Sequence, residues 1–314
     1  MLWASIEINL LRFIPIILFT HENQETEASI KYFLAQSIGS SILLIRRISI
    51  WIIFSIRDKS LIYILIFSIL LKLGMVPCHI WYPSVIISIP WASCAILSTW
   101  QKLAPLRVLS FILIQKTRNI LLYVAALNSI VGGIIGINQT HLRAILAYSS
   151  INHIGWIISI LSINKPLITI LYFIVYVAVA FPLFVVLALN KLTTVSARIT
   201  KSIYALKPHT FIPIILLNLG GMPPIRGFAA KWLALSELII VNKLICYVLI
   251  MGSIIALYFY LNMGLRLLSV NISKKWNNCP FTDPKTGFLA APLNIVLINL
   301  TASTIVPGFI LFIV

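Results

Sequence analysis

The chain has 314 residues, of which 60% are hydrophobic and 10% are charged. Soluble domains carry roughly 45–50% apolar and about 25% charged residues, so this composition excludes an ordinary soluble globule, a disordered chain and a disulfide-rich scaffold. Lys and Arg number 24 against 7 Asp and Glu, which gives a formal net charge of +17. The basic residues are scattered, mostly singly, through apolar sequence, and this favours contact with an anionic membrane leaflet over nucleic-acid binding.

Apolar runs of about 20 residues, the length that a membrane-spanning helix needs, recur along the whole chain. They predict an all-α, polytopic transmembrane bundle of about ten helices. No linker divides the chain, so we expect a single membrane domain over residues 1–314. The predicted spans cover residues 1–20, 27–56, 60–88, 91–114, 119–137, 142–162, 166–190, 209–240, 244–266 and 292–313.

Two of these spans are interrupted by Gly and Pro, and the interruptions are similar. Residues 71–77 read Leu-Lys-Leu-Gly-Met-Val-Pro, and residues 217–223 read Leu-Asn-Leu-Gly-Gly-Met-Pro. Gly and Pro interrupt the hydrogen-bond ladder of a helix, and paired interruptions in two halves of a chain point to the ion path of a transporter. We therefore predict two broken helices in repeated halves. Chance similarity of two short runs is the alternative.

Four charged residues inside the spans are the candidate site: Glu7, Lys72, Lys102 and Lys231. A charge at the centre of a spanning helix costs about 3 kcal/mol on insertion scales, so such groups normally face the bundle interior and mark ion or proton paths. Buried Lys and Glu can exchange protons near neutral pH. We interpret these four residues as a proton path. For each Lys, the alternative is a side chain that extends to the membrane surface.

Three further residues are secondary relay candidates: His79, just beyond the first interruption, His153 and Glu237. A structural histidine is the alternative for each His, and Glu237 is alternatively a charge at a helix end or facing a partner. The chain has no dinucleotide-binding, Walker A or zinc-protease motif, and its four cysteines lack the spacing of metal ligands. We therefore expect neither a metal nor a redox cofactor in this chain.

The polar segments of the chain resemble, in the same order over about residues 3–265, those of the mitochondrial subunit 2 family of NADH dehydrogenase. These are the antiporter-like subunits of respiratory complex I. The segments are Glu7-Ile-Asn-Leu-Leu, residues 27–36, Lys72 to Trp81, Thr99 to Pro105, Ala147 to Trp156, and Leu219 to Pro224 with Gly227-Phe and Lys231-Trp.

The resemblance implies a core membrane-arm subunit of the proton-pumping NADH:ubiquinone oxidoreductase. It implies two inverted repeats of five helices, each with one broken helix, over roughly 1–114 and 119–266, with a C-terminal loop and helix over 267–314. The resemblance implies that Glu7 and Lys72 form a Glu–Lys switch. It implies that Lys102 is a central relay and that Lys231 is an exit-side proton site.

The resemblance also implies the surroundings of the chain. Its place is the mitochondrial inner membrane, and its partners are other complex I membrane-arm subunits, including neighbouring antiporter-like subunits, and lipids such as cardiolipin. FMN, iron–sulfur clusters and ubiquinone are expected in other subunits. A free-standing cation/proton antiporter is the first alternative function, and a membrane scaffold without a proton path is the second.

The chain departs from the family in two respects. It begins inside what is usually the second helix of animal members, so one N-terminal helix is expected to be absent. Five arginines also stand in or beside apolar spans, where the family tends to have small or polar residues: Arg12, Arg46, Arg47, Arg107 and Arg226.

The overall residue usage suggests an origin for these arginines. The chain contains 58 Ile and only 5 Met. Many invertebrate mitochondrial codes read ATA as Met and AGA as Ser, whereas other codes read them as Ile and Arg. We therefore hypothesise that some Ile and Arg positions are Met and Ser in the protein. The alternative is a compositional bias, with Arg side chains that extend to the membrane surface or pair across subunits.

Overall fold

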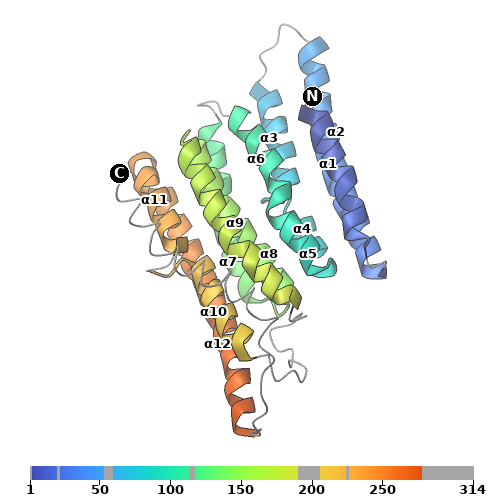
Figure 1. Cartoon of the computed structure of the whole chain (residues 1–314). Coiled ribbons are helices and arrows are strands. Elements are labelled where there is room, and N and C mark those ends of the chain that lie inside the picture. Colours follow the sequence, from blue (N-terminus) through green and yellow to red (C-terminus); the bar gives the residue numbers. More distant parts are fainter. Residues whose placement is uncertain are drawn as a thin grey trace.

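A computed structural model gives the chain as a bundle of roughly parallel and antiparallel helices, with α1 and α2 at one side and α11 at the other (Figure 1). It describes residues 2–19, 22–52, 59–112, 117–189, 206–223 and 226–277, without the side chains of 2, 46–52, 59–61, 206–211 and 266–277. The described residues form α1 (Leu2–Ile17), α2 (Asn23–Ile52), α3 (Lys59–Leu73), α4 (Trp81–Ser88), α5 (Trp91–Ser98), α6 (Trp100–Ile112), α7 (Arg118–Ile137), α8 (Leu142–Ser162), α9 (Pro166–Leu189), α10 (Leu206–Gly220), α11 (Arg226–Val241) and α12 (Lys243–Asn277).

The all-α prediction is confirmed, and nine of the ten predicted spans coincide with these helices. The tenth, 292–313, lies outside the described residues. Five of the described helices, namely α2, α7, α8, α9 and α12, are each long and apolar enough to cross a membrane. Three predicted spans are each divided into two shorter helices, which are α3 with α4, α5 with α6, and α10 with α11.

Both predicted breaks are confirmed, and each begins at a glycine. Helix α3 ends one residue before Gly74, which has φ 68°, and α10 ends one residue before Gly221, which has φ 79°. Glycine adopts this left-handed conformation without the steric penalty of a Cβ atom. The chain can therefore leave the helix at these two points and start a new helix a few residues later.

A third interruption, at Thr99, divides the span 91–114, which the sequence analysis expected to be one helix. The Thr99 hydroxyl donates to the carbonyl of Ala95 over 2.6 Å, and the carbonyl of Thr99 accepts from the Lys102 N–H over 3.3 Å. A threonine hydroxyl that bonds to the backbone competes with the regular helical ladder. The local backbone consequently tightens between α5 and α6.

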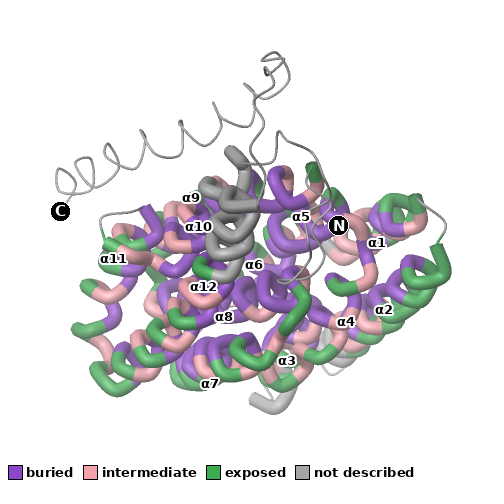
Figure 2. The backbone as a smooth tube through the Cα atoms, turned by 90° about the horizontal axis from the view of Figure 1, so that it is seen from below, coloured by how far each residue is buried: buried purple, intermediate pink, exposed green. Residues whose placement is uncertain are grey.

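Helix α8 lies in the middle of the bundle and is buried along nearly its whole length (Figure 2). Its neighbour α7 approaches it closely at two glycines. A Cβ atom on Gly132 would lie 2.8 Å from the carbonyl oxygen of Tyr148, and one on Gly155 would lie 2.8 Å from that of Ala125. Small residues allow helices in membranes to pack backbone to backbone, and this contact forms the centre of the core.

Candidate functional site

The backbone of the first break is stabilised by side chains from two other helices. Trp81, at the start of α4, donates its indole N–H to the carbonyl of Leu71 over 3.0 Å. Gln36 of α2 donates its amide to the carbonyl of Lys72 over 3.1 Å. Carbonyl groups at the end of a helix lose their intrahelical partners, so these two bonds satisfy the last turn of α3 inside the bundle.

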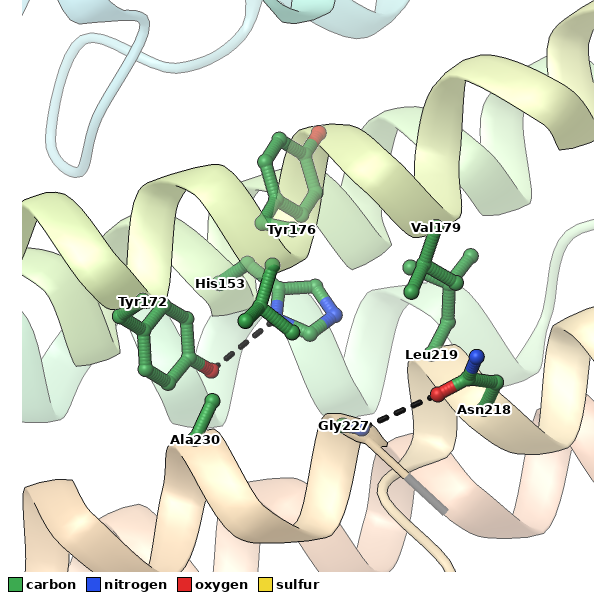
Figure 3. A pocket seen from close by; sticks show the side chains of 9 residues that line it. His153, Tyr172, Tyr176, Val179, Asn218, Leu219, Gly227 and Ala230 are labelled. Carbon is green, nitrogen blue, oxygen red and sulfur yellow. Dashed lines mark hydrogen bonds between the residues drawn. The ribbon is translucent and has the colours of Figure 1, made fainter. Parts of the chain in front are cut away.

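An asparagine serves each break by accepting a backbone N–H. The side-chain oxygen of Asn128, on α7, accepts from Val76 over 2.9 Å. The side-chain oxygen of Asn218, on α10, accepts from Gly227 of α11 over 3.0 Å (Figure 3). An unpaired backbone N–H away from water is costly, so both asparagines make it possible to keep an open backbone within the bundle.

Lys72 occupies the last turn of α3 with its side chain almost completely buried. Its Nζ has no hydrogen-bond partner among the described residues. Glu7, half-buried on α1, acts on it electrostatically. No ion pair within 4.0 Å joins Glu7 to Lys72 in the described part of the chain. The two residues of the predicted switch are therefore near each other but separated.

Lys102 lies on α6 and shares a cavity of ≈ 20 Å³ with Lys72. A space of about 10–15 Å³ admits the centre of one water molecule, provided that it finds polar partners. The cavity walls include Gln36, Gln101 and the ring of Tyr82. The first two buried lysines of the predicted path thus line a single polar cavity.

His153 of α8 lies among side chains of α9, α10 and α11 (Figure 3). Its Nδ1 is 3.1 Å from the hydroxyl of Tyr172, and its ring centroid is 5.1 Å from that of Tyr176. Both Lys102 and Lys231 act on it electrostatically. His153 also lines a small second cavity, whose other walls come from α9, α10 and α11.

Lys231 lies on α11 and extends its side chain back across the second break. Its Nζ donates to the carbonyl of Gly220, the last residue of α10, over 2.8 Å. Basic side chains commonly bind the free carbonyls at a helix C-terminus. The bond therefore stabilises the break and also holds a cation inside the bundle.

Two of the secondary candidates lie apart from this group. His79 is half-buried in the segment between α3 and α4, and its Nδ1 has no hydrogen-bond partner among the described residues. Glu237 forms an ion pair of 3.2 Å with Lys165, and both side chains are partly exposed. Partly exposed pairs of this kind contribute about 0–1 kcal/mol, so the described contact of Glu237 is that of a charge near the end of a helix.

Polar and aromatic residues that were not predicted from the sequence complete the site. The ring of Tyr82 lies 4.6 Å from the Nζ of Lys102, and the ring of Tyr176 lies 5.9 Å from it. Asn9 of α1 donates to the side chain of Gln101 of α6 over 2.7 Å. The available signal was the occurrence of Tyr, Gln and Asn inside apolar spans.

Of the five arginines singled out by the sequence, three have described side chains. Arg12 on α1 and Arg107 on α6 are exposed, and the guanidinium of Arg107 lies 5.8 Å from the ring of Phe111. Arg226, the first residue of α11, is buried, and its Nε has no hydrogen-bond partner among the described residues. The side chains of the remaining two, Arg46 and Arg47, lie outside the described ones.

Comparisons with known proteins agree with this architecture. A family model described as "NADH:quinone oxidoreductase/Mrp antiporter, TM" matches residues 1–256. The NADH-ubiquinone oxidoreductase chain 2 of Lumbricus terrestris is 48% identical over 284 residues, which cover 90% of this chain and 84% of that protein. The chain 2 protein of Hylobates lar is 38% identical over 306 residues, which cover 93% and 86% of the two chains.

Solved structures share the fold at low sequence identity. A chain of respiratory complex I from Thermus thermophilus matches with a TM-score of 0.81 at 21% identity, covering 98% of this chain and 73% of that one. A chain of the Mrp complex from Dietzia matches with a TM-score of 0.70 at 18% identity, covering 90% and 57%. The matched family model and the identity to the two relatives show the family of this chain, and the bundle with its two broken helices agrees with them. The chain belongs to the NADH:quinone oxidoreductase/Mrp antiporter family, among the NADH-ubiquinone oxidoreductase chain 2 proteins.

Proposed function

We propose that this chain is a membrane-arm subunit of the proton-pumping NADH:ubiquinone oxidoreductase and translocates protons through Glu7, Lys72, Lys102 and Lys231. Family membership supports the assignment to this enzyme. The redox groups, which are FMN, iron–sulfur clusters and ubiquinone, belong to other subunits in this proposal. The contribution of the chain is proton transfer coupled to their electron transfer.

The observation that carries the proposal is a row of buried ionisable groups connecting the two broken helices. Lys72 and Lys102 line one cavity. The ring of Tyr176 lies 5.9 Å from the Nζ of Lys102 and 5.1 Å from the ring of His153. Ionisable groups inside a membrane bundle are costly and usually mark a transport path. A scaffold function would not require three buried lysines, because apolar residues would pack at lower cost.

The geometry suggests how charge moves along this row. Lys72 has no hydrogen-bond partner for its Nζ among the described residues, so it can exchange a proton without first breaking a strong bond there. Formation of an ion pair with Glu7 would hold the charge on Lys72, and separation would free its proton for the cavity shared with Lys102. His153 then serves as the intermediate between Lys102 and Lys231.

The substitution Lys72→Ala tests the proposal. We expect it to lower NADH-driven proton pumping while the enzyme complex assembles and oxidises NADH, because it removes the group that the first broken helix contributes to the row. Lys31→Ala is the matched control, since Lys31 is an exposed lysine that pairs with Glu27 on the surface of α2. Pumping is measured as protons moved per NADH oxidised in vesicles.

Normal pumping by the Lys72→Ala enzyme would remove this lysine from the mechanism. Near-silent substitutions at all four proposed residues, with assembly intact, would support the scaffold alternative. Proton/cation exchange by the reconstituted single chain would support a free-standing antiporter, which the chain 2 relatives do not favour.

The proposed location is the mitochondrial inner membrane, with neighbouring antiporter-like subunits as partners. The fold that this chain shares with members of respiratory complexes supports assembly with other subunits. A formal charge of +17 favours contact with anionic lipid, and cardiolipin is the proposed lipid of this kind. Co-purification of the chain with a large NADH-oxidising membrane complex would test the partners and the location together.

A further inference from the structure

The ammonium group of Lys102 is held by two aromatic rings. Lys102 is 3% exposed, and its Nζ has no hydrogen-bond partner among the described residues. The Nζ lies 4.6 Å from the ring centroid of Tyr82 and 5.9 Å from that of Tyr176. An ammonium group within about 6 Å of a ring centroid is attracted by the electron-rich face of the ring. The two rings are thus the cation–π contacts of this ammonium group among the described residues.

Both rings are fixed by their surroundings. Tyr82 is 1% exposed and Tyr176 is 5% exposed. The Ser150 hydroxyl, on the central helix α8, donates to the hydroxyl of Tyr82 over 2.8 Å. A ring that is packed and hydrogen-bonded loses little further freedom when it binds a cation, so the contact is available without reorganisation.

Each ring also connects Lys102 to another part of the row. Tyr82 packs directly on the first break, since a Cβ atom on Gly74 would lie 2.8 Å from the Cβ of Tyr82. Tyr176 packs on the ring of His153 with centroids 5.1 Å apart (Figure 3). A change at the break or at the histidine would therefore move a ring that contacts the ammonium group.

We propose that Tyr82 and Tyr176 are positioning residues that form an aromatic clamp for the Lys102 ammonium group during proton transfer. The clamp stabilises a buried cation through the ring faces, and Tyr82 links its position to the first broken helix. This inference rests on the proposed function, because it assigns the two tyrosines to the proton path through Lys102.

The test compares removal of the ring with removal of the hydroxyl alone in the assembled enzyme complex. Tyr82→Leu should lower the rate of NADH-driven proton pumping about ten-fold, which corresponds to about 1.4 kcal/mol and lies within the range of desolvated cation–π contacts. Tyr82→Phe keeps the ring face and should retain most of the pumping. Tyr176→Leu should likewise pump more slowly than Tyr176→Phe. The difference should be smaller than at Tyr82, because the ring of Tyr176 is farther from the Nζ of Lys102.

Phe184→Leu is the control for loss of a buried ring, since Phe184 is 4% exposed and packs against Trp91, which does not line the cavity of Lys72 and Lys102. Complex assembly is checked for every variant on native gels. Rescue by Phe but not by Leu would support the clamp. Equal loss in Tyr82→Phe and Tyr82→Leu would overturn it, because the hydroxyl and not the ring would then matter.

The failure of the clamp is distinguishable from failure of the proposed function. If Tyr82→Leu pumps normally while Lys72→Ala does not, the clamp is wrong and the proton path stands. If Lys72→Ala and Lys102→Ala both pump normally, the path itself is wrong and the clamp falls with it. If the Tyr82→Leu complex does not assemble, the clamp is tested by comparing proton pumping of the Tyr176→Leu and Tyr176→Phe complexes.

Discussion

Two of the buried lysines lie directly against glycines. A Cβ atom on Gly39 of α2 would lie 2.8 Å from the Cγ of Lys72 and 3.2 Å from its Cε. A Cβ atom on Gly221 would lie 3.0 Å from both the Cδ and the Nζ of Lys231. Contacts this short force the neighbouring group to move. The glycines therefore provide the space in which the long lysine side chains lie inside the bundle.

The substitution Gly39→Ala should lower NADH-driven proton pumping several-fold, because the added methyl group displaces the side chain of Lys72 from the cavity shared with Lys102. Gly264→Ala is the matched control, since its Cβ would meet Pro213 at 3.3 Å and no predicted site residue. Pumping per NADH is the measurement. Equal pumping in the two variants would mean that the position of the Lys72 stem is unimportant.

Single residues were predictable from the sequence where their chemistry is unusual for their surroundings. A lysine inside an apolar span is conspicuous, and Lys72, Lys102 and Lys231 are all buried in the bundle. The rings of Tyr82 and Tyr176 were not predicted, because aromatic residues are ordinary members of apolar spans. Their contact with Lys102 depends on how α4, α6 and α9 pack, and no local sequence pattern specifies this.

The broken helices were predictable as elements because Gly and Pro act on the local backbone. The residues from other helices that form hydrogen bonds to the backbone of the breaks were not predictable. Asn128 of α7 is completely buried and accepts the N–H of Val76, which lies in the first break. The interruption at Thr99 was also missed, since a single threonine inside an apolar span does not mark a break. The interruption coincides with the hydrogen bond from the Thr99 hydroxyl to the carbonyl of Ala95.

The substitution Asn128→Ala should destabilise the chain by about 1–3 kcal/mol, the cost of leaving a buried donor without its acceptor. A lowered thermal stability of the purified complex would show this loss. Ser129→Ala is the neighbouring control, because the Ser129 hydroxyl is buried but bonds within α7 to the carbonyl of Ala126. If both variants lose the same stability, the hydrogen bond between Asn128 and the first break does not stabilise the chain more than a bond within α7 does.

At the scale of the whole molecule, the two halves repeat a backbone feature with different chemistry. In the similar segments 71–77 and 217–223, Lys72 corresponds to Asn218. Lys72 presents a buried ammonium group just before its break, whereas Asn218 accepts the N–H of Gly227 across its own break. The cation of the second half, Lys231, instead follows the break. The inverted relation of the halves remains a prediction, and each half contributes a cation in its own way.

The arginines inside apolar spans raise a question about residue identity along the entire chain. Arg226 begins α11, where the positive end of the helix dipole opposes a cation. It is also buried, and its Nε lacks a hydrogen-bond partner among the described residues. Serine would remove both costs. Arg12 and Arg107 are exposed on apolar helices, where each central charge costs about 3 kcal/mol.

We therefore expect serine in the purified protein at Arg12, Arg46, Arg47, Arg107 and Arg226, and methionine at some of the 58 Ile positions. Each serine would remove one positive charge, which accounts for part of the formal +17. Peptide mass spectrometry after trypsin digestion decides the question, because trypsin cleaves after arginine and not after serine. Uncut peptides with serine masses across these five positions are the expected result, with cleavage after Lys231 as the internal control. Cleavage and arginine masses at all five would end the hypothesis and leave the alternative, a compositional bias with arginine side chains that extend to the membrane surface or pair across subunits.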